Sequence, residues 1–136
     1  MRLLSLLAVL AVMASADRIL VLFDHMSTRD SHSIFFKQLT DRGHQLTYKS
    51  ADDTSLALIK FGQLAYEHLI VFAPSVDEFG GSVSATEIGR FVDEGGNVLL
   101  AGSGKGIGAA FRDVVADNGF ELAEQLIDHI HFHPVL

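Results

Sequence analysis

The feature that most constrains the fold is a run of five consecutive apolar residues, 19–23, which ends at Asp24. A run this short and this rich in branched side chains is typical of a strand buried on both faces, as in a parallel sheet. Similar runs follow at residues 69–72 and 98–101. A half-alternating segment at 44–50 predicts a further strand, which we expect at the outside of the sheet.

Apolar residues at helical spacing separate these strands. Four helices are predicted: one after residue 30 that ends at Gly43, one over residues 55–67, one from Ser84 to Gly95, and one after residue 108 that ends at Asn118. Asp30 or Ser31 is expected to cap the first, and Ser84, with Glu87 three residues later, the third. The residues predicted to face inward are Ile34, Phe35 and Leu39; Leu56, Ile59, Leu64 and Tyr66; Ile88, Phe91 and Val92; and Phe111, Val114 and Val115.

This alternation predicts a three-layer, doubly wound parallel α/β sheet of the flavodoxin-like type, with the first strand central. The length of 136 residues fits one domain. A net charge of −7 disfavours a nucleic-acid partner, because such proteins carry a basic face. The absence of cysteine from the sequence excludes disulfides and cysteine nucleophiles.

The first sixteen residues have the composition of a secretory signal peptide. Arg2 precedes an apolar block at residues 3–13, and Ala14-Ser15-Ala16 completes the pattern. We expect residues 1–16 to be cleaved, so that Asp17 begins the mature chain on the lumenal side of the secretory pathway. The alternative is a buried N-terminal helix.

A candidate anion or ligand site follows from the rule that ligands bind beyond the carboxyl ends of parallel strands. Its predicted members are Asp24, Gly102, Ser103 and Gly104. Residues 104–109 fit the Gly-x-Gly-x-x-Ala dinucleotide pattern, but they follow the fourth strand instead of the first. The alternative is a glycine-rich turn that packs closely over the sheet, and no cofactor is predicted.

Ser103 also stands where α/β-hydrolases place a nucleophile, between a strand and a helix. That motif requires glycine two residues before and after the serine, and this chain has Ala101 and Lys105. We therefore do not expect catalysis by Ser103.

Two sets of side chains suggest metal ligands. Asp24, Asp77 and Glu78 follow neighbouring strands and suit a hard cation such as Mg²⁺. The three alternating histidines of residues 129–133 suit zinc geometrically, but we favour the alternative that they stand in a terminal segment by chance. Neither set is predicted as a metal site.

Several blocks of sequence, taken together, resemble one known family. The blocks are residues 18–24, 28–36, 41–47, 51–56, 58–62 and 69–81, the last of which contains Pro-Ser-Val-Asp-Glu-Phe-Gly-Gly. In this order and spacing they resemble the 48 kDa subunit of oligosaccharyltransferase, the complex of the endoplasmic reticulum that N-glycosylates proteins. The resemblance extends from about Arg18 to His129.

The resemblance implies a non-catalytic, lumenal subunit that assembles and stabilises the complex, while glycosyl transfer belongs to another subunit. It implies a domain related to class I glutamine amidotransferases without their cysteine, so no catalytic residue is carried over. The expected partners are the other subunits, and membrane association is expected through the complex. The alternative is a soluble module that binds a small molecule or anion through the loop at residues 102–108.

Beyond His129 the sequence leaves the family pattern. We interpret residues 17–129 as an incomplete N-terminal lumenal domain and residues 130–136 as a divergent tail. Members of the family continue through further lumenal domains to a membrane helix, so we expect this chain to be a truncated product or a fragment.

Overall fold

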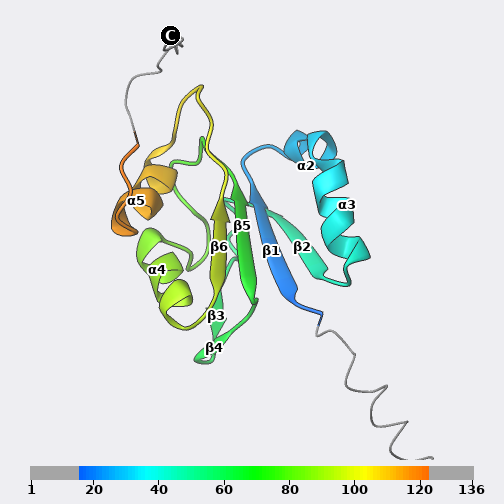
Figure 1. Ribbon diagram of the computed structural model, residues 1–136. Coiled ribbons are helices and arrows are strands. Elements are labelled where there is room, and N and C mark those ends of the chain that lie inside the picture. Colours follow the sequence, from blue (N-terminus) through cyan, green and yellow to red (C-terminus); the bar gives the residue numbers. More distant parts are fainter. Residues whose placement is uncertain (1–15, 123–136) are drawn as a thin grey trace, which may run out of the picture.

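The computed structural model describes residues 16–122, which form an α/β fold with a mostly parallel sheet between helices (Figure 1). The main sheet contains β1 (Arg18–Phe23), β2 (Gln45–Ser50), β5 (His68–Phe72) and β6 (Asn97–Leu100). The helices are α2 (Ser27–Ser31), α3 (Ser33–Asp41), α4 (Ala85–Asp93) and α5 (Ala109–Asp117). A separate antiparallel hairpin is formed by β3 (Ile59–Lys60) and β4 (Gln63–Leu64).

The strand order in the main sheet is β2-β1-β5-β6, and every neighbouring pair is parallel. β1 lies inside the sheet, with Ile19 opposite both Leu46 of β2 and His68 of β5. Its five apolar residues are all buried, which explains why this strand has no polar alternation. The predictions that the first strand is internal and that the second is an outer strand are confirmed.

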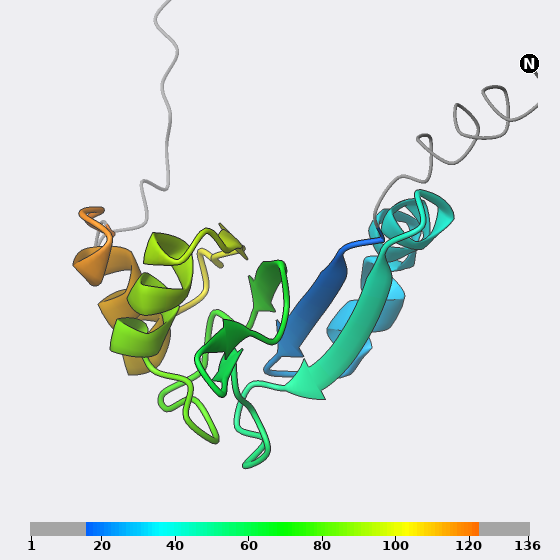
Figure 2. The ribbon, with the colours of Figure 1, turned by 90° about the horizontal axis from the view of Figure 1, so that it is seen from below.

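Helices cover the two faces of the sheet, because successive residues of a strand point to opposite sides. Figure 2 shows α2 and α3 on one side and α4 and α5 on the other. On the first side, Phe23 packs edge-on against Phe36 of α3, with 5.7 Å between ring centroids. The second side forms the larger core, whose fully buried members include Leu20, Leu22, Leu69, Val71, Ile88, Phe91, Phe111 and Val114.

The helix predicted over residues 55–67 is wrong, because this segment forms the β3–β4 hairpin. Phe61 and Gly62 both have positive φ, 53° and 73°, as a two-residue hairpin turn requires. The expected inward residues do reach the core: Leu56 is buried, and Ile59, Leu64 and Tyr66 pack against it. Their spacing fits a helix and an irregular hairpin equally, so the pattern alone predicted the wrong element.

The first predicted helix is also corrected. One helix was predicted to begin after residue 30, yet α2 begins at Ser27, and α3 follows after His32. No side-chain hydrogen bond caps either helix, so neither Asp30 nor Ser31 has the predicted role. Ile34 is 76% exposed instead of facing inward, and Phe36 takes the buried position.

The predictions for α4 and α5 are largely confirmed. The Ser84 side chain accepts a hydrogen bond from the Glu87 backbone N–H at 3.1 Å, as a helix cap does. Gly95, with φ of 100°, follows the end of α4. Of the inward residues, only Val92 is wrong, because it is 40% exposed.

Several predictions concern segments outside the described residues. They include most of the signal peptide and the histidines of residues 129–133. Within residues 16–122, no helix combines the length and the apolar character that crossing a membrane requires.

Candidate functional site

The structure brings most of the predicted ligand site together at the carboxyl ends of the strands. Asp24 follows β1, and Gly102 and Ser103 follow β6. All three line one hollow of about 510 Å³. Gly104 is not among its lining residues, whereas Lys105 is. The hollow therefore lies where the topology places ligands in parallel α/β sheets.

Asp24 is held in place by the loop after β5. Its Oδ2 atom accepts hydrogen bonds from the Ser75 backbone N–H at 3.1 Å and from the Ser75 hydroxyl at 2.6 Å. Partial burial alone would raise the pKa of Asp24, but the Ser75 bonds, with smaller contributions from His25, outweigh it and lower the pKa. Asp24 is thus ionised at neutral pH, and its end of the hollow favours hydroxyl or cationic groups over an anion.

The glycine-rich loop at residues 102–108 packs closely against the neighbouring loop. The Gly108 N–H donates to the carbonyl of Pro74 at 2.7 Å. A Cβ at Gly108 would lie 2.6 Å from the carbonyl oxygen of Ser75, so only glycine fits there. Gly108 also precedes α5, whose first backbone N–H, on Ala109, donates to Asp77 Oδ1 at 3.3 Å. Close packing of the two loops therefore explains why glycine is needed at residue 108. This is the alternative to a dinucleotide-binding loop that the sequence offered.

Ser103 has no activating partner in the described part of the chain. Its hydroxyl oxygen accepts a hydrogen bond from the Lys105 backbone N–H at 3.1 Å. No histidine of residues 16–122 is hydrogen-bonded to it. An unactivated hydroxyl is a poor nucleophile, so the geometry gives no support to hydrolase chemistry.

The acidic side chains at this edge do not form a ligand set. Asp24, Asp77 and Glu78 line a second hollow of about 320 Å³. Asp24 is bonded to Ser75, and Asp77 accepts from the start of α5. Among residues 16–122, no three histidine or acidic side chains are grouped so that they could hold a metal ion.

The loop at residues 74–81, which contains the Pro-Ser-Val-Asp-Glu-Phe-Gly-Gly motif, joins distant parts of the fold. Val76 and Phe79 are buried in the larger core. The Gly80 N–H donates to the carbonyl of Ala51 at 2.9 Å. A Cβ at Gly81 would lie 2.7 Å from the backbone nitrogen of Leu56. These residues hold the segment after β2 against the sheet, which is a structural role.

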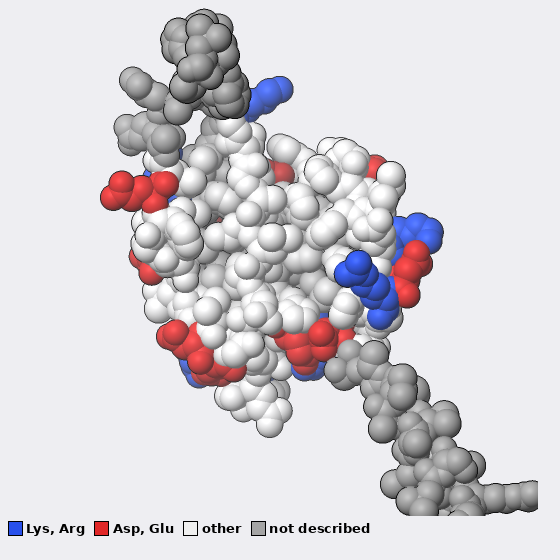
Figure 3. All heavy atoms as spheres, viewed as in Figure 1, with Lys and Arg blue, Asp and Glu red and all other residues white. Residues whose placement is uncertain are grey.

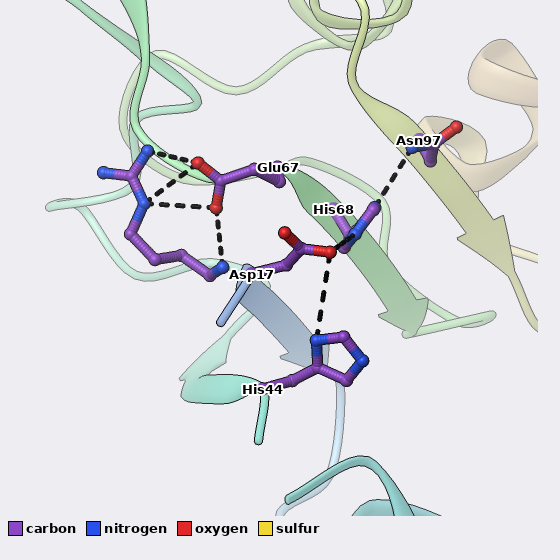
Figure 4. A network of polar contacts seen from close by, with 6 residues as sticks. Asp17, His44, Glu67, His68 and Asn97 are labelled. Carbon is purple, nitrogen blue, oxygen red and sulfur yellow. Dashed lines mark hydrogen bonds and ion pairs between the residues drawn. The ribbon is translucent and has the colours of Figure 1, made fainter. Parts of the chain in front are cut away.

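A polar network at the opposite edge of the sheet was not predicted (Figure 4). There the carboxylate of Asp17 lies between two histidines. His68 Nε2 lies 3.0 Å from Asp17 Oδ2, and His68 Nδ1 lies 3.1 Å from the Asn97 amide nitrogen. His44 Nδ1 lies 3.9 Å from the same Asp17 oxygen, and within the described residues this buried nitrogen has no hydrogen-bond partner.

An ion pair lies beside this network. Arg18 Nη2 is 2.5 Å from Glu67 Oε1, and the Arg18 backbone N–H donates to Glu67 Oε2 at 2.6 Å. The Arg18 side chain, followed by its backbone N–H, lowers the pKa of Glu67 to about 2. Asp17, His44, Glu67, His68 and Asn97 all stand at or just before the first residue of a strand. We infer that this network fixes the amino-terminal ends of the four strands of the main sheet relative to one another.

The charges of the surface are unevenly placed. Figure 3 shows that Lys, Arg, Asp and Glu side chains lie around the outside of the face seen in Figure 1, while its middle is uncharged. β6 lies at the front of this view, and its Leu99 side chain is 47% exposed. Contact surfaces between proteins have such uncharged centres and charged rims.

Comparison with known proteins identifies the family. A family model described as "OST48, N-terminal domain" matches residues 10–134. The chain is 53% identical over 125 residues to the dolichyl-diphosphooligosaccharide–protein glycosyltransferase 48 kDa subunit of Drosophila melanogaster. It is 48% identical over 124 residues to the protein of the same name from Caenorhabditis elegans, and 49% identical over 116 residues to that of Danio rerio.

These matches cover 90%, 89% and 83% of this chain, respectively. They cover only 28%, 28% and 26% of the relatives, so the chain spans little more than a quarter of their length. Because the family model covers nearly the whole sequence, the chain belongs to the OST48 N-terminal domain family.

Proposed function

We propose that this chain is the N-terminal α/β domain of a non-catalytic accessory subunit of oligosaccharyltransferase, which supports N-glycosylation of asparagine by assembling and stabilising the complex. The observation that carries the proposal is the match of residues 10–134 to the OST48 N-terminal domain. The relatives are named as subunits of a glycosyltransferase. The expected partners are accordingly the other subunits of that complex, and membrane association comes through them.

The non-catalytic role is supported by what the most distinctive residues do. The loop at residues 74–81 packs into the core, and Gly108 closes against it. Ser103, the one candidate nucleophile weighed above, is bonded to a backbone amide instead of a base. These residues maintain the fold, and an uncharged face is left for contact with other polypeptides.

The finer fold assignment is also a proposal. The order β2-β1-β5-β6 corresponds to the first four strands of the flavodoxin-like order 2-1-3-4-5. This correspondence, together with the family resemblance, supports a domain of the flavodoxin-like and class I glutamine-amidotransferase-like type.

We place the domain on the lumenal side of the endoplasmic-reticulum membrane, because residues 1–16 have the pattern of a signal peptide. A cut after Ala16 leaves the sheet intact, since β1 begins at Arg18 and Asp17 keeps its contacts with His68. Mass spectrometry of the chain recovered from microsomes is expected to find Asp17 as its first residue. An uncleaved amino end would contradict this placement.

The assembly role is tested by affinity capture. The tagged chain is expressed in animal cells, microsomes are solubilised in a mild detergent, and the captured proteins are identified by mass spectrometry. We expect the other oligosaccharyltransferase subunits to be recovered. The matched control lacks residues 1–16 and should recover none, because it stays outside the lumen. Recovery of no subunit by the whole chain, or glycan transfer by the purified chain alone, would refute the proposal.

A second candidate is a small-molecule binder, favoured by the hollow that Asp24, Gly102 and Ser103 share. The ionised Asp24 would accept hydrogen bonds from ligand hydroxyls. Calorimetric titration with nucleotides and sugar phosphates tests this reading, with Asp24→Asn as the control variant. Absence of binding heat for every compound of the panel would refute this second candidate function.

A further inference from the structure

The β3–β4 hairpin carries a phenyl ring with no place in the folded domain. Phe61 stands at its tip and is 105% exposed, the largest value among the exposed hydrophobic residues. Ile34, the next most exposed, reaches 76%. Single exposed apolar residues are common on protein surfaces, so exposure alone proves little. The backbone of Phe61 supplies a second, independent observation.

Phe61 has a φ of 53°, and it is the one non-glycine residue of positive φ within the described part of the chain. The left-handed region is unfavourable for a residue with a Cβ, and Asn, Asp or Gly normally occupies this position of a two-residue turn. Asparagine at residue 61 would make the same turn with less strain and no exposed ring. The phenylalanine therefore opposes both the folding and the solubility of the domain.

The hairpin beneath the ring is firmly held. Ile59 and Leu64, paired across the strands, pack against the larger core. The Ala65 N–H donates to the carbonyl of Leu58 at 2.8 Å, and Arg18 Nη2 lies 3.4 Å from the carbonyl of Leu64. Figure 1 shows the hairpin at the end of the molecule where β5 begins. A rigid support loses little conformational freedom when the ring is bound.

From these observations we propose that Phe61 is a contact anchor, which inserts into an apolar pocket of another protein subunit of the complex. This inference rests on the proposed function, and it names the surface through which that function acts. Lys60, exposed beside Phe61, is the charged residue of the tip and suits a carboxylate at the rim of the pocket. Buried aromatic anchors of this kind dominate the binding energy of protein interfaces.

A lipid surface or a second copy of the chain fits the observations less well. One phenyl ring gives too little apolar burial for stable membrane attachment, and the net charge of −7 opposes an anionic bilayer. A symmetric contact with a second copy would bring two hairpin tips together, and such a contact lacks the area of a stable dimer.

Site-specific photocrosslinking tests the proposal in microsomes. Benzoylphenylalanine replaces Phe61 in the whole chain, and Ile34 is the matched exposed control on α3. Crosslinks from position 61 to another oligosaccharyltransferase subunit are expected, with few or none from position 34. Crosslinks from position 61 only to lipid, or only to a second copy of the chain, would overturn the inference.

Variants at the same position separate contact from folding. Phe61→Asn is expected to lower recovery of the complex about tenfold or more, as the loss of an interface anchor does. Its thermal midpoint should equal or exceed that of the wild type, because asparagine relieves the turn. Phe61→Tyr keeps the ring and should restore recovery. Undiminished recovery by Phe61→Asn refutes the anchor while the accessory-subunit role stands; failure of the wild type to recover any subunit refutes both.

Discussion

Replacing Gly108 by alanine is expected to destabilise the domain strongly. Its φ of −71° suits any residue, so the backbone conformation is not strained by the change. The added Cβ would lie 2.6 Å from the Ser75 carbonyl oxygen and closer still to that of Val76. Carbon and oxygen normally stay at least ~3.2 Å apart, and both obstructing groups belong to a backbone that cannot rotate away.

The magnitude follows from two effects. Overpacking of a tight site costs about 1–3 kcal/mol. Separation of the loops also weakens the bond from the Gly108 N–H to the Pro74 carbonyl, which contributes about 1 kcal/mol. A total near 3 kcal/mol lowers the urea midpoint by about 1.5–2 M, for an m-value of about 1.5–2 kcal/mol per M.

Gly89→Ala is the matched control. Gly89 lies within α4, and a Cβ there would meet nothing within 4 Å. Alanine is favoured over glycine inside a helix by about 1 kcal/mol, so this variant should raise the midpoint slightly. Urea unfolding of both variants, followed by circular dichroism, gives the comparison. A Gly108→Ala midpoint at or above the wild-type value would show that the close approach of the two loops is wrong.

Two further predictions concern the cap of α4 and the ion pair at the strand starts. Ser84→Ala removes the acceptor of the Glu87 N–H and should lower the free energy of unfolding by about 1 kcal/mol, whereas Ser84→Asp keeps an acceptor and should unfold like the wild type. Glu67 has a folded pKa of about 2 against an ordinary value of 4.5, so it stabilises the fold above pH 4.5 and loses that contribution as the pH falls toward 2. Glu67→Gln removes this dependence, and an unchanged slope of stability between these pH values would contradict the role of its pair with Arg18.

Much of the fold follows from the sequence because buried parallel strands carry a strong signal. The apolar run at residues 98–101 gave the same signal, yet β6 is the outer strand of the described sheet, and its Leu99 side chain is 47% exposed. β1 and β5 lack polar alternation, whereas β2 shows it. This difference predicted correctly that β1 lies inside the sheet and that β2 is an outer strand. The prediction of a helix over residues 55–67 was wrong because tertiary packing determines the structure of this segment. Gly62 was the available clue, since glycine is favoured at the second position of a two-residue turn, but the phenylalanine before it is untypical of such a turn and weakened the signal.

The residues at the carboxyl ends of the strands and those at the amino ends differ in how well the sequence predicts their arrangement. Asp24 and Ser103 were assigned together because the carboxyl ends of parallel strands meet at one edge, and the structure does place both at one hollow. Asp17, His68 and Asn97 were missed because each looked like an ordinary polar residue before a strand. The available signal was that every strand of the main sheet begins with or directly after a polar residue. These residues become neighbours only through the register of the strands, which the sequence does not show.

The internal position of β1 has a consequence for synthesis. β1 is the first strand to leave the ribosome, yet Ile19 pairs with His68, which is made roughly fifty residues later. At about 5–20 residues per second, the apolar strand waits several seconds for its second neighbour. During that interval the nascent chain exposes an apolar, aggregation-prone strand. Its folding should therefore depend on chaperones more than the folding of a protein whose strands pair in the order in which they are synthesised.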